Sequence, residues 1–309
     1  MGTTLHVAVA ASSRAEGIRA TEDAFEAVRR LDRLLSTWRD DSEISRLNHA
    51  PPRLPVPLSP ELYALLQEAA EWTRSTGGAF DPAIGPLIDA WDLRGRGRIA
   101  SPSTLAAARA ATGIRHFAFA EPVRSVARTD SSAWMDTGGF GKGAALREAR
   151  RALLRRGISS AMLNFGGQVM VLGVDRAGRH WVVPVAHPSR RAEPVLWLHC
   201  RDRSVSTSSQ SERFVTAGGR RVGHVLDPRT GQPVPAWGSV TVVAEDPIAA
   251  DVLSTALLVL GPHAGLRWAL DREDVGVLFL IERDGTVERR WNRALEEFLL
   301  ADSIFSPGG

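Results

Sequence analysis

The chain has 309 residues, of which 44% are hydrophobic and 24% are charged, so it can bury a substantial core and has the composition of a globular protein. Its formal charge is only +3, with arginines scattered among Asp and Glu, which argues against nucleic acid as the main partner. The single cysteine, Cys200, excludes a disulfide framework and a cysteine-based metal site, and we expect it to be buried.

No apolar run reaches the length of a membrane span, and the N-terminus lacks the charged-then-apolar pattern of a signal peptide. We therefore expect no transmembrane segment and a cytoplasmic protein. A leader removed from an exported or membrane-anchored form is the alternative that stays open.

The N-terminal part of the chain is predicted to be mainly helical. Residues 1–11 alternate apolar and polar side chains as a strand does, and residues 16–35 have helical spacing. A polar segment with Trp38 follows, and its indole is either a core side chain or a ring that stacks on a planar ligand. Further helices are expected over residues 61–76, 84–91 and 105–112.

Short strands are expected over residues 116–119, 123–128 and 133–135, and the last leads into the sequence DTGGFGKG at 136–143. Its glycines allow close approach of a ligand, and the helix that follows adds partial positive charge suited to phosphate. Asp136 can accept hydrogen bonds from a ring edge or hydroxyl, and Lys142, the only lysine, can bind an anionic oxygen. The alternative is a tight turn with a solvated lysine, because the spacing matches neither common phosphate-loop motif.

The C-terminal half is predicted to be mainly strands, with one apolar helix. Strands are expected on both sides of Gly166-Gly167 and over 181–185, 195–200, 239–244 and 275–281, with a hydroxyl-rich strand end at 204–213. The helix is expected over 248–260. Because helices and strands occur in uneven blocks, the sequence favours an α+β fold over a regular βαβ series.

A metal ligand pair is suggested by Asp251 and Thr255, which lie four residues apart and so leave the same face of the apolar helix. A buried carboxylate needs a partner, and Mg²⁺ held by carboxylate, hydroxyl and phosphate oxygens is one candidate. The alternative is an acidic residue that the helix dipole favours near an N-terminus.

Taken in order, the segments MGT, TWRDDSEISRLN, GGAFDPAIGPLIDAW, MDTGGFGKGAALREA, LNFGGQV, STSS, GHVLDPRTGQPV and AADVLSTALLVLG resemble the ApbE-type FAD:protein FMN transferases. The resemblance runs from Met1 to about Gly261. It implies a single domain over 1–309 with an ApbE-like, two-lobed α+β fold of mixed or antiparallel sheets flanked by helices. Residues 262–309 would add a C-terminal strand and tail.

The resemblance implies a Mg²⁺-dependent transferase with FAD as its substrate. Such an enzyme attaches FMN through a phosphoester to a Thr or Ser of a target flavoprotein and releases AMP. Two alternatives stay open, a FAD pyrophosphatase that forms FMN and AMP, and a non-catalytic flavin-binding protein.

The resemblance also assigns roles to residues of this chain. The catalytic set is Lys142, His224 and Asp251. The metal set is Gly139 through its carbonyl, Asp251, Ser254 and Thr255. The FAD contacts are Met1, Trp38, Ala79, Phe80, Asp81, Asp136, Lys142 and Val225. The chain departs from the family pattern at Gln168, Ser209 and Ser211, the last two standing where Gly and Tyr are usual, and these serines keep both alternatives open.

Overall fold

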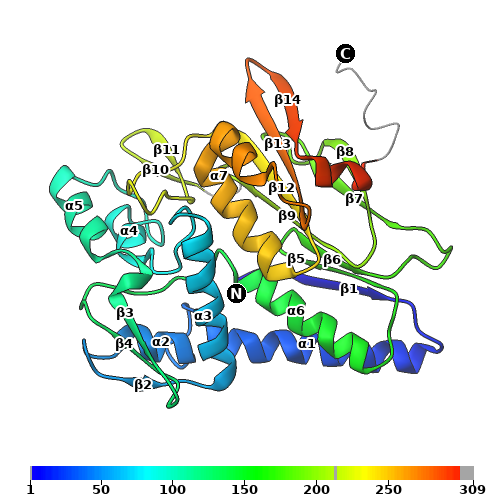
Figure 1. The fold of residues 1–309 in the computed structure, drawn as a ribbon, viewed down its shortest axis with the longest axis horizontal. Coiled ribbons are helices and arrows are strands. Elements are labelled where there is room, and N and C mark those ends of the chain that lie inside the picture. The colour runs from blue at the N-terminus through cyan, green and yellow to red at the C-terminus, as the bar shows by residue number, and fades with distance from the viewer. Residues whose placement is uncertain (1, 212–213, 300–309) are drawn as a thin grey trace. The chain divides into compact units, whose positions relative to one another are not determined.

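The computed structural model describes residues 2–211 and 214–299, and the chain divides into two compact units. The first unit comprises residues 30–141 and 210–236, and the second comprises the remaining described residues. Helices and antiparallel sheets make up both units, which confirms the predicted α+β class and the division into two lobes (Figure 1). The assignment of all 309 residues to a single family domain stays a prediction.

The second unit is built on a seven-stranded antiparallel sheet with strand order β1-β5-β6-β9-β12-β13-β14 (Figure 1). Strands β6 and β12 of this sheet are buried along their whole length, because both faces of the sheet are covered there. The strands are β1 (Leu5–Val9), β5 (Ala161–Phe165), β6 (Gln168–Leu172), β9 (Ser204–Ser209), β12 (Gly238–Ala244), β13 (Val275–Arg283) and β14 (Thr286–Trp291).

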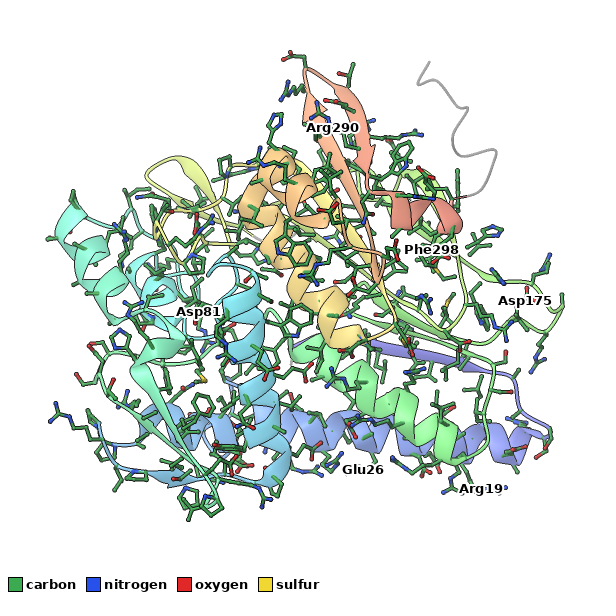
Figure 2. All side chains as sticks on the ribbon, in the orientation of Figure 1. Arg19, Glu26, Asp81, Asp175, Arg290 and Phe298 are labelled. Carbon is green, nitrogen blue, oxygen red and sulfur yellow. The ribbon has the colours of Figure 1, made fainter. Side chains whose placement is uncertain are left out.

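One face of this sheet packs against α7 (Pro247–Ala269), which contacts β9, β12 and β13. The other face packs against the hairpin of β7 (Trp181–Ala186) and β8 (Pro194–Cys200) and against η2 (Arg293–Phe298). Phe298, labelled in Figure 2, and the fully buried Cys200 belong to the apolar cluster on this side. The expected burial of Cys200 is therefore confirmed.

Helix α7 is long and apolar enough to cross a membrane by length and composition, the only such helix among the described residues. Most of it is buried against the sheet, as in the core helix of a soluble domain, so the feature is weak evidence for a span. The helix is interrupted at Gly261, whose φ of 76° and ψ of 170° are non-helical, and Pro262 follows this residue. The predicted boundary at residue 260 coincides with this interruption.

Two other helices connect the units along the chain. Helix α1 (Arg14–Leu35) begins in the second unit and continues into the first, and α6 (Gly141–Arg155) begins at the last residue of the first unit's long segment. The remaining elements belong to the first unit. They are α2 (Glu43–His49), β2 (Val56–Pro57), α3 (Pro60–Ser75), α4 (Gly85–Ala90), α5 (Pro102–Ala111), η1 (Ile114–His116), β3 (Phe117–Ala120), β4 (Ser125–Arg128), β10 (Phe214–Ala217) and β11 (Arg220–Gly223).

Two local predictions were wrong, and one helix was not predicted. Residues 133–135 form no strand, because the backbone of Met135 is paired by a side chain: Asn48 accepts from its N–H and donates to its carbonyl, both at 2.9 Å. The polar segment after Trp38, for which no element was predicted, contains α2, which follows the capping residue Ser42. Beyond residue 261 the chain adds the end of α7, two strands and η2, rather than one strand and a tail.

Candidate functional site

The N-termini of α6 and α7 meet in the second unit, and a glycine permits the contact. A Cβ added to Gly143 would lie 2.4 Å from the carbonyl oxygen of Pro247 and 2.7 Å from the Cα of Ile248. Both atoms belong to the backbone and cannot move aside. Only glycine therefore allows the first turn of α6 to lie directly against the first turn of α7.

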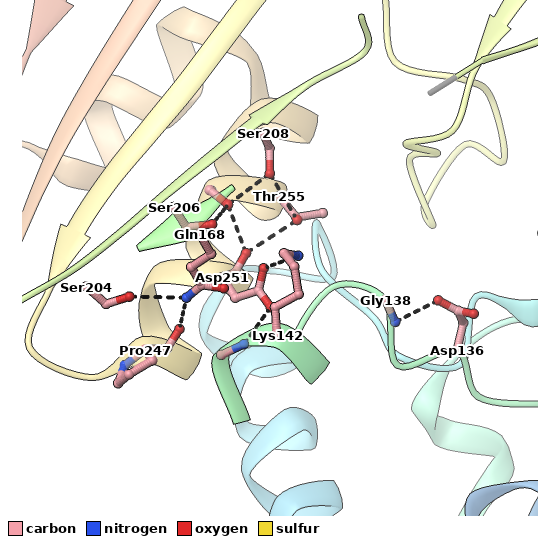
Figure 3. A network of polar contacts seen from close by, with 12 residues as sticks. Asp136, Gly138, Lys142, Gln168, Ser204, Ser206, Ser208, Pro247, Asp251 and Thr255 are labelled. Atoms are coloured by element: carbon pink, nitrogen blue, oxygen red, sulfur yellow. Dashed lines mark hydrogen bonds and ion pairs between the residues drawn. The ribbon is translucent and has the colours of Figure 1, made fainter. Parts of the chain in front are cut away.

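This contact encloses the carboxylate of Asp251, whose side chain is only 2% exposed. Its Oδ1 accepts a hydrogen bond from Lys142 Nζ at 2.7 Å, and its Oδ2 accepts one from the Gly143 N–H at 3.0 Å (Figure 3). The buried negative charge is thus compensated by the only lysine of the chain. The glycine-rich loop and the apolar helix, predicted separately, supply the two sides of one ion pair.

Hydroxyl groups of β9 and α7 lie beside Asp251. Because side chains alternate along a strand, Ser206 and Ser208 of β9 both face α7. Their hydroxyls lie 3.2 and 2.8 Å from the Ser254 hydroxyl, and Ser208 also lies 3.4 Å from the Thr255 hydroxyl. Ser254 and Thr255 in turn donate to the Asp251 carbonyl at 3.0 and 3.4 Å (Figure 3).

This donor set suits a hard divalent cation. It offers one carboxylate and several hydroxyl oxygens but no thiol or imidazole, and Mg²⁺ prefers oxygen ligands and keeps part of its shell for water or substrate phosphate. No group of three or more His, Cys, Asp or Glu able to hold a metal is present in the described parts of the chain. A cation here would accordingly complete its shell with water before substrate binds and with substrate oxygens afterwards, as in phosphoryl-transfer sites.

Gln168 supports the start of α7 from strand β6. Its amide nitrogen donates to the Pro247 carbonyl at 2.7 Å and to the Ser204 hydroxyl at 3.2 Å. Its Oε1 is buried and has no hydrogen-bond partner among the residues that the structure describes. The longer side chain that replaces the family's usual Asp or Asn thus anchors the backbone behind Asp251. The resemblance gave no role to Gln168, and the structure shows that its side chain supports the start of α7.

The first unit holds the acidic residue of the glycine-rich loop, Asp136. Its Oδ1 accepts from Arg94 Nη2 at 2.6 Å. Its Oδ2 accepts from the Gly138 N–H at 2.8 Å (Figure 3). Arg94 also donates to the Thr37 carbonyl and hydroxyl at 3.1 and 2.6 Å. The sequence did not distinguish Arg94 from the many other arginines.

The same guanidinium lies against two indole rings. Its carbon is 4.6 Å from the ring centre of Trp38 and 4.4 Å from that of Trp134, within the range of cation–π attraction. Trp38 is 68% exposed, so it is not a core side chain. Of the two interpretations of Trp38, the structure favours an exposed ring that is accessible to a planar ligand.

The segment Ala79–Asp81 carries three predicted FAD contacts, two of them with buried side chains. Ala79 and Phe80 are 1% and 4% exposed, and the Phe80 ring packs against Gly139, where an added Cβ would lie 3.0 Å away. Asp81, labelled in Figure 2, accepts hydrogen bonds from the N–H groups of Ala83 and Ile114. Burial raises the pKa of Asp81 above its ordinary value, and these backbone donors oppose the shift.

The backbone at His224 and Val225 is fixed by a residue that the sequence did not indicate. The side-chain amide of Gln210 donates to the carbonyls of Val225 and Val234 at 2.6 and 2.8 Å and accepts from the Val225 N–H at 3.0 Å. This amide lies so close to Gly223 that a Cβ there would be 2.1 Å from it. Because glutamine is a common residue, the sequence did not single out Gln210, and its contacts with the backbone of Val225 and Val234 are evident only from the fold.

The predicted residues are therefore divided between the units. The second unit brings Lys142, Asp251, Ser254 and Thr255 together, and the first holds Trp38, Asp136, Gly139 and the segments around Phe80 and His224. Ser209 lies on the opposite face of β9 from Ser208 and donates to the Gly238 carbonyl at 3.1 Å, and Ser211 is exposed. Met1 lies outside the described residues, and the assigned roles of all these residues stay predictions.

A model of the ApbE family matches residues 1–279. The chain belongs to the ApbE family. This match extends the region of resemblance past residue 261 to include most of β13.

Known ApbE proteins resemble the chain in sequence and fold. Curated relatives named FAD:protein FMN transferase from Klebsiella pneumoniae (strain 342) and Treponema pallidum (strain Nichols) are 32% and 31% identical to it. These matches cover 94% and 90% of the chain and 85% and 81% of the relatives. The ApbE protein of Thermotoga maritima superimposes with a TM-score of 0.88 at 28% identity, and the flavin transferase ApbE of Vibrio cholerae with 0.83 at 26%.

Both structural matches cover 97% of this chain and 96% of the other. The predicted family, the ApbE-like fold and the prediction of a transferase enzyme are confirmed.

Proposed function

We propose that this ApbE-family protein is a Mg²⁺-dependent FAD:protein FMN transferase. The observation that carries the proposal is the buried Asp251 carboxylate, held on an apolar helix between a lysine ammonium and a set of hydroxyl oxygens. Such a site needs positive charge, and phosphoryl transfer requires positive charge around the phosphates more than covalent chemistry from the protein. The relatives' shared name supplies FAD as the donor and a protein as the acceptor of FMN. The acceptor Thr or Ser of a flavoprotein is what the family resemblance implies.

In this proposal, Asp251, Thr255 and Ser254 of the second unit hold the cation, and the Gly139 carbonyl stays a ligand predicted from the resemblance alone. Bound Mg²⁺ would neutralise charge on the pyrophosphate and on the AMP leaving group. Lys142 donates to a pyrophosphate oxygen, and Trp38 and Asp136 bind the flavin through its ring face and polar edge. Ser208 lies at hydrogen-bond distance from both Ser254 and Thr255 and keeps their hydroxyls in place.

The reaction is a single displacement at the FMN phosphorus. The acceptor oxygen forms a bond to that phosphorus, and the bond from the phosphorus to the bridging pyrophosphate oxygen breaks, so that AMP leaves. The acceptor hydroxyl loses its proton, and His224 is the imidazole of the predicted catalytic set suited to accept it. Attack by water at the same atom would release free FMN instead.

The test is incubation of the protein with FAD, MgCl₂ and a candidate flavoprotein acceptor, followed by AMP chromatography and in-gel flavin fluorescence. The proposal predicts AMP and a fluorescent acceptor band, both lost with EDTA and with Asp251→Asn. AMP with free FMN but no labelled acceptor would indicate the pyrophosphatase. Tight FAD binding without AMP in any mixture would indicate a flavin-binding protein.

A further inference from the structure

Lys142 and Asp251 form a buried ion pair in which the two partners are held very differently. Both carboxylate oxygens of Asp251 accept hydrogen bonds, and the side chain is 2% exposed. The Lys142 side chain is 30% exposed, and its ammonium makes one hydrogen bond to the described residues. An ammonium has three donors, so two stay available to water or to another oxygen.

A second pair between the same helices shows what a fixed contact looks like. Arg147 of α6 donates through Nε at 2.8 Å and through Nη2 to the two oxygens of Asp246, the capping residue of α7. That two-pronged contact holds the guanidinium in one orientation. Lys142 instead has a flexible stem and a single contact, so the ammonium can leave without any movement of the backbone.

The ammonium cannot leave Asp251 uncompensated, because an unpaired buried carboxylate is unfavourable. The carboxylate would therefore release Lys142 only in exchange for another cation. A divalent ion that binds the hydroxyls of Ser254 and Thr255 and competes for Asp251 Oδ1 would provide that exchange.

We infer that Lys142 is an internal counter-cation, which occupies Asp251 until a divalent metal displaces it and only then becomes free to bind the pyrophosphate of FAD. The inference rests on the proposed function, since it needs a metal and an anionic substrate at this site. It adds an order of events, with metal before productive FAD binding. It also makes the coupling reciprocal: the metal strengthens FAD binding by the same factor by which FAD strengthens metal binding, and part of that factor passes through Lys142.

The single lysine makes the exchange directly observable. Protein labelled with ¹⁵N-lysine has one Nζ resonance, and MgCl₂ added to the FAD-free protein should shift it from the ion-paired to a solvated position. Asp251→Asn should show the solvated position before any metal is added. A resonance that does not move while calorimetry shows Mg²⁺ binding would overturn the inference.

Metal affinity gives a second, independent measurement. Titration of FAD-free protein with Mn²⁺, followed by electron paramagnetic resonance, should show Lys142→Met binding about 10- to 100-fold more tightly than wild type, because one charge-assisted hydrogen bond no longer competes. Arg147→Met is the matched control. It removes a basic partner from the same pair of helices but should leave Mn²⁺ affinity unchanged.

Equal Mn²⁺ affinities for wild type and Lys142→Met would contradict the exchange. An equal gain in Mn²⁺ affinity for Lys142→Met and Arg147→Met would also contradict it, because such a gain would reflect net charge alone. If Lys142→Met does not fold, the wild-type resonance still decides. Absence of metal binding to wild type even with FAD present would instead refute the metal dependence in the proposed function. AMP release with a stationary lysine signal would refute only the exchange.

Discussion

Each unit of the molecule holds one predicted acidic residue against one basic residue, and the two pairs are built for different purposes. In the first unit, Arg94 contacts Asp136, Thr37 and the rings of Trp38 and Trp134, so its guanidinium is held from several sides. In the second unit, the Lys142 ammonium makes one hydrogen bond to Asp251. The first pair fixes the orientation of a carboxylate, whereas the second compensates a charge and can be exchanged.

The difference follows from the chemistry of the two basic side chains. Arginine has a planar fork of donors and stacks on aromatic rings, so many weak contacts can hold it at once. Lysine carries a compact charge on a flexible stem and suits a site where the partner changes. Apart from Lys142, every lysine or arginine position of the chain is arginine. The single lysine therefore lies where we propose that a divalent metal displaces the basic side chain.

Removing the carboxylate of the exchangeable pair should have the largest effect. We expect Asp251→Ala to lower Mg²⁺-dependent AMP release by about 10³-fold or more, because the only carboxylate proposed to hold the metal is lost. The variant should also lose about 1–3 kcal/mol of stability, since the buried Gly143 N–H loses its acceptor. Turnover per folded molecule and urea unfolding are the measurements, and a folded variant with normal AMP release would contradict the metal site.

The exchangeable partner should matter less than the carboxylate. We expect Lys142→Ala to weaken FAD binding and lower turnover by about 1.5–3 kcal/mol, roughly 10- to 150-fold, and Lys142→Arg to restore only part of either. The broad guanidinium is a poor substitute where Gly143 already packs against the backbone of α7. Flavin fluorescence titration and AMP release test this, and near-identical values for all three proteins would remove Lys142 from the site.

The Arg94–Asp136 pair should respond differently when lysine and arginine are substituted for each other. Arg94→Lys should behave almost like Arg94→Ala, with about 10-fold weaker FAD binding, because lysine cannot reproduce the forked contacts or the stacking on two indoles. The control is Arg39→Ala, which breaks an exposed pair with Asp41 beside Trp38 and should change little. If Arg94→Lys binds FAD like wild type, the two pairs do not differ as described.

The smallest effect is expected for the reactivity of Cys200, which serves as a control for folding of the second unit. Cys200 is fully buried, and burial raises the pKa of its thiol to about 12. Because the thiolate is the reactive form, we expect no reaction with a disulfide reagent near pH 8 in wild type or in the Lys142 and Asp251 variants, and full reaction in urea. Rapid labelling of a native variant would show that its loss of activity comes from an opened core.

The sequence predicted those features of the site that depend on short spacing or on a rare residue. Asp251 and Thr255 are separated by one helical turn, and Lys142 is unique in the chain, so both could be identified before the fold was known. Their pairing could not, because 109 residues separate Lys142 from Asp251 and no local pattern links them. The apolar composition of the helix indicated that Asp251 would be buried if the helix lay in the core, and the fold identified its partner.

Features set by tertiary contacts were missed or misread. Arg94 is one of many arginines, and only its position beside Asp136 and two tryptophans distinguishes it. Residues 133–135 have the composition of a strand, yet the Asn48 side chain satisfies the Met135 backbone in place of a neighbouring strand. In each case the decisive group is distant in sequence and has a common residue type.

The most direct test of the central claim is the intact mass of a flavoprotein acceptor after incubation with this protein, FAD and MgCl₂. We expect the acceptor to gain the mass of one FMN less one water, with one AMP released per molecule modified. We expect no change in the acceptor mass when Asp251→Asn replaces the wild type or EDTA replaces MgCl₂. An acceptor that gains this mass equally with Asp251→Asn, or in EDTA, would contradict the account.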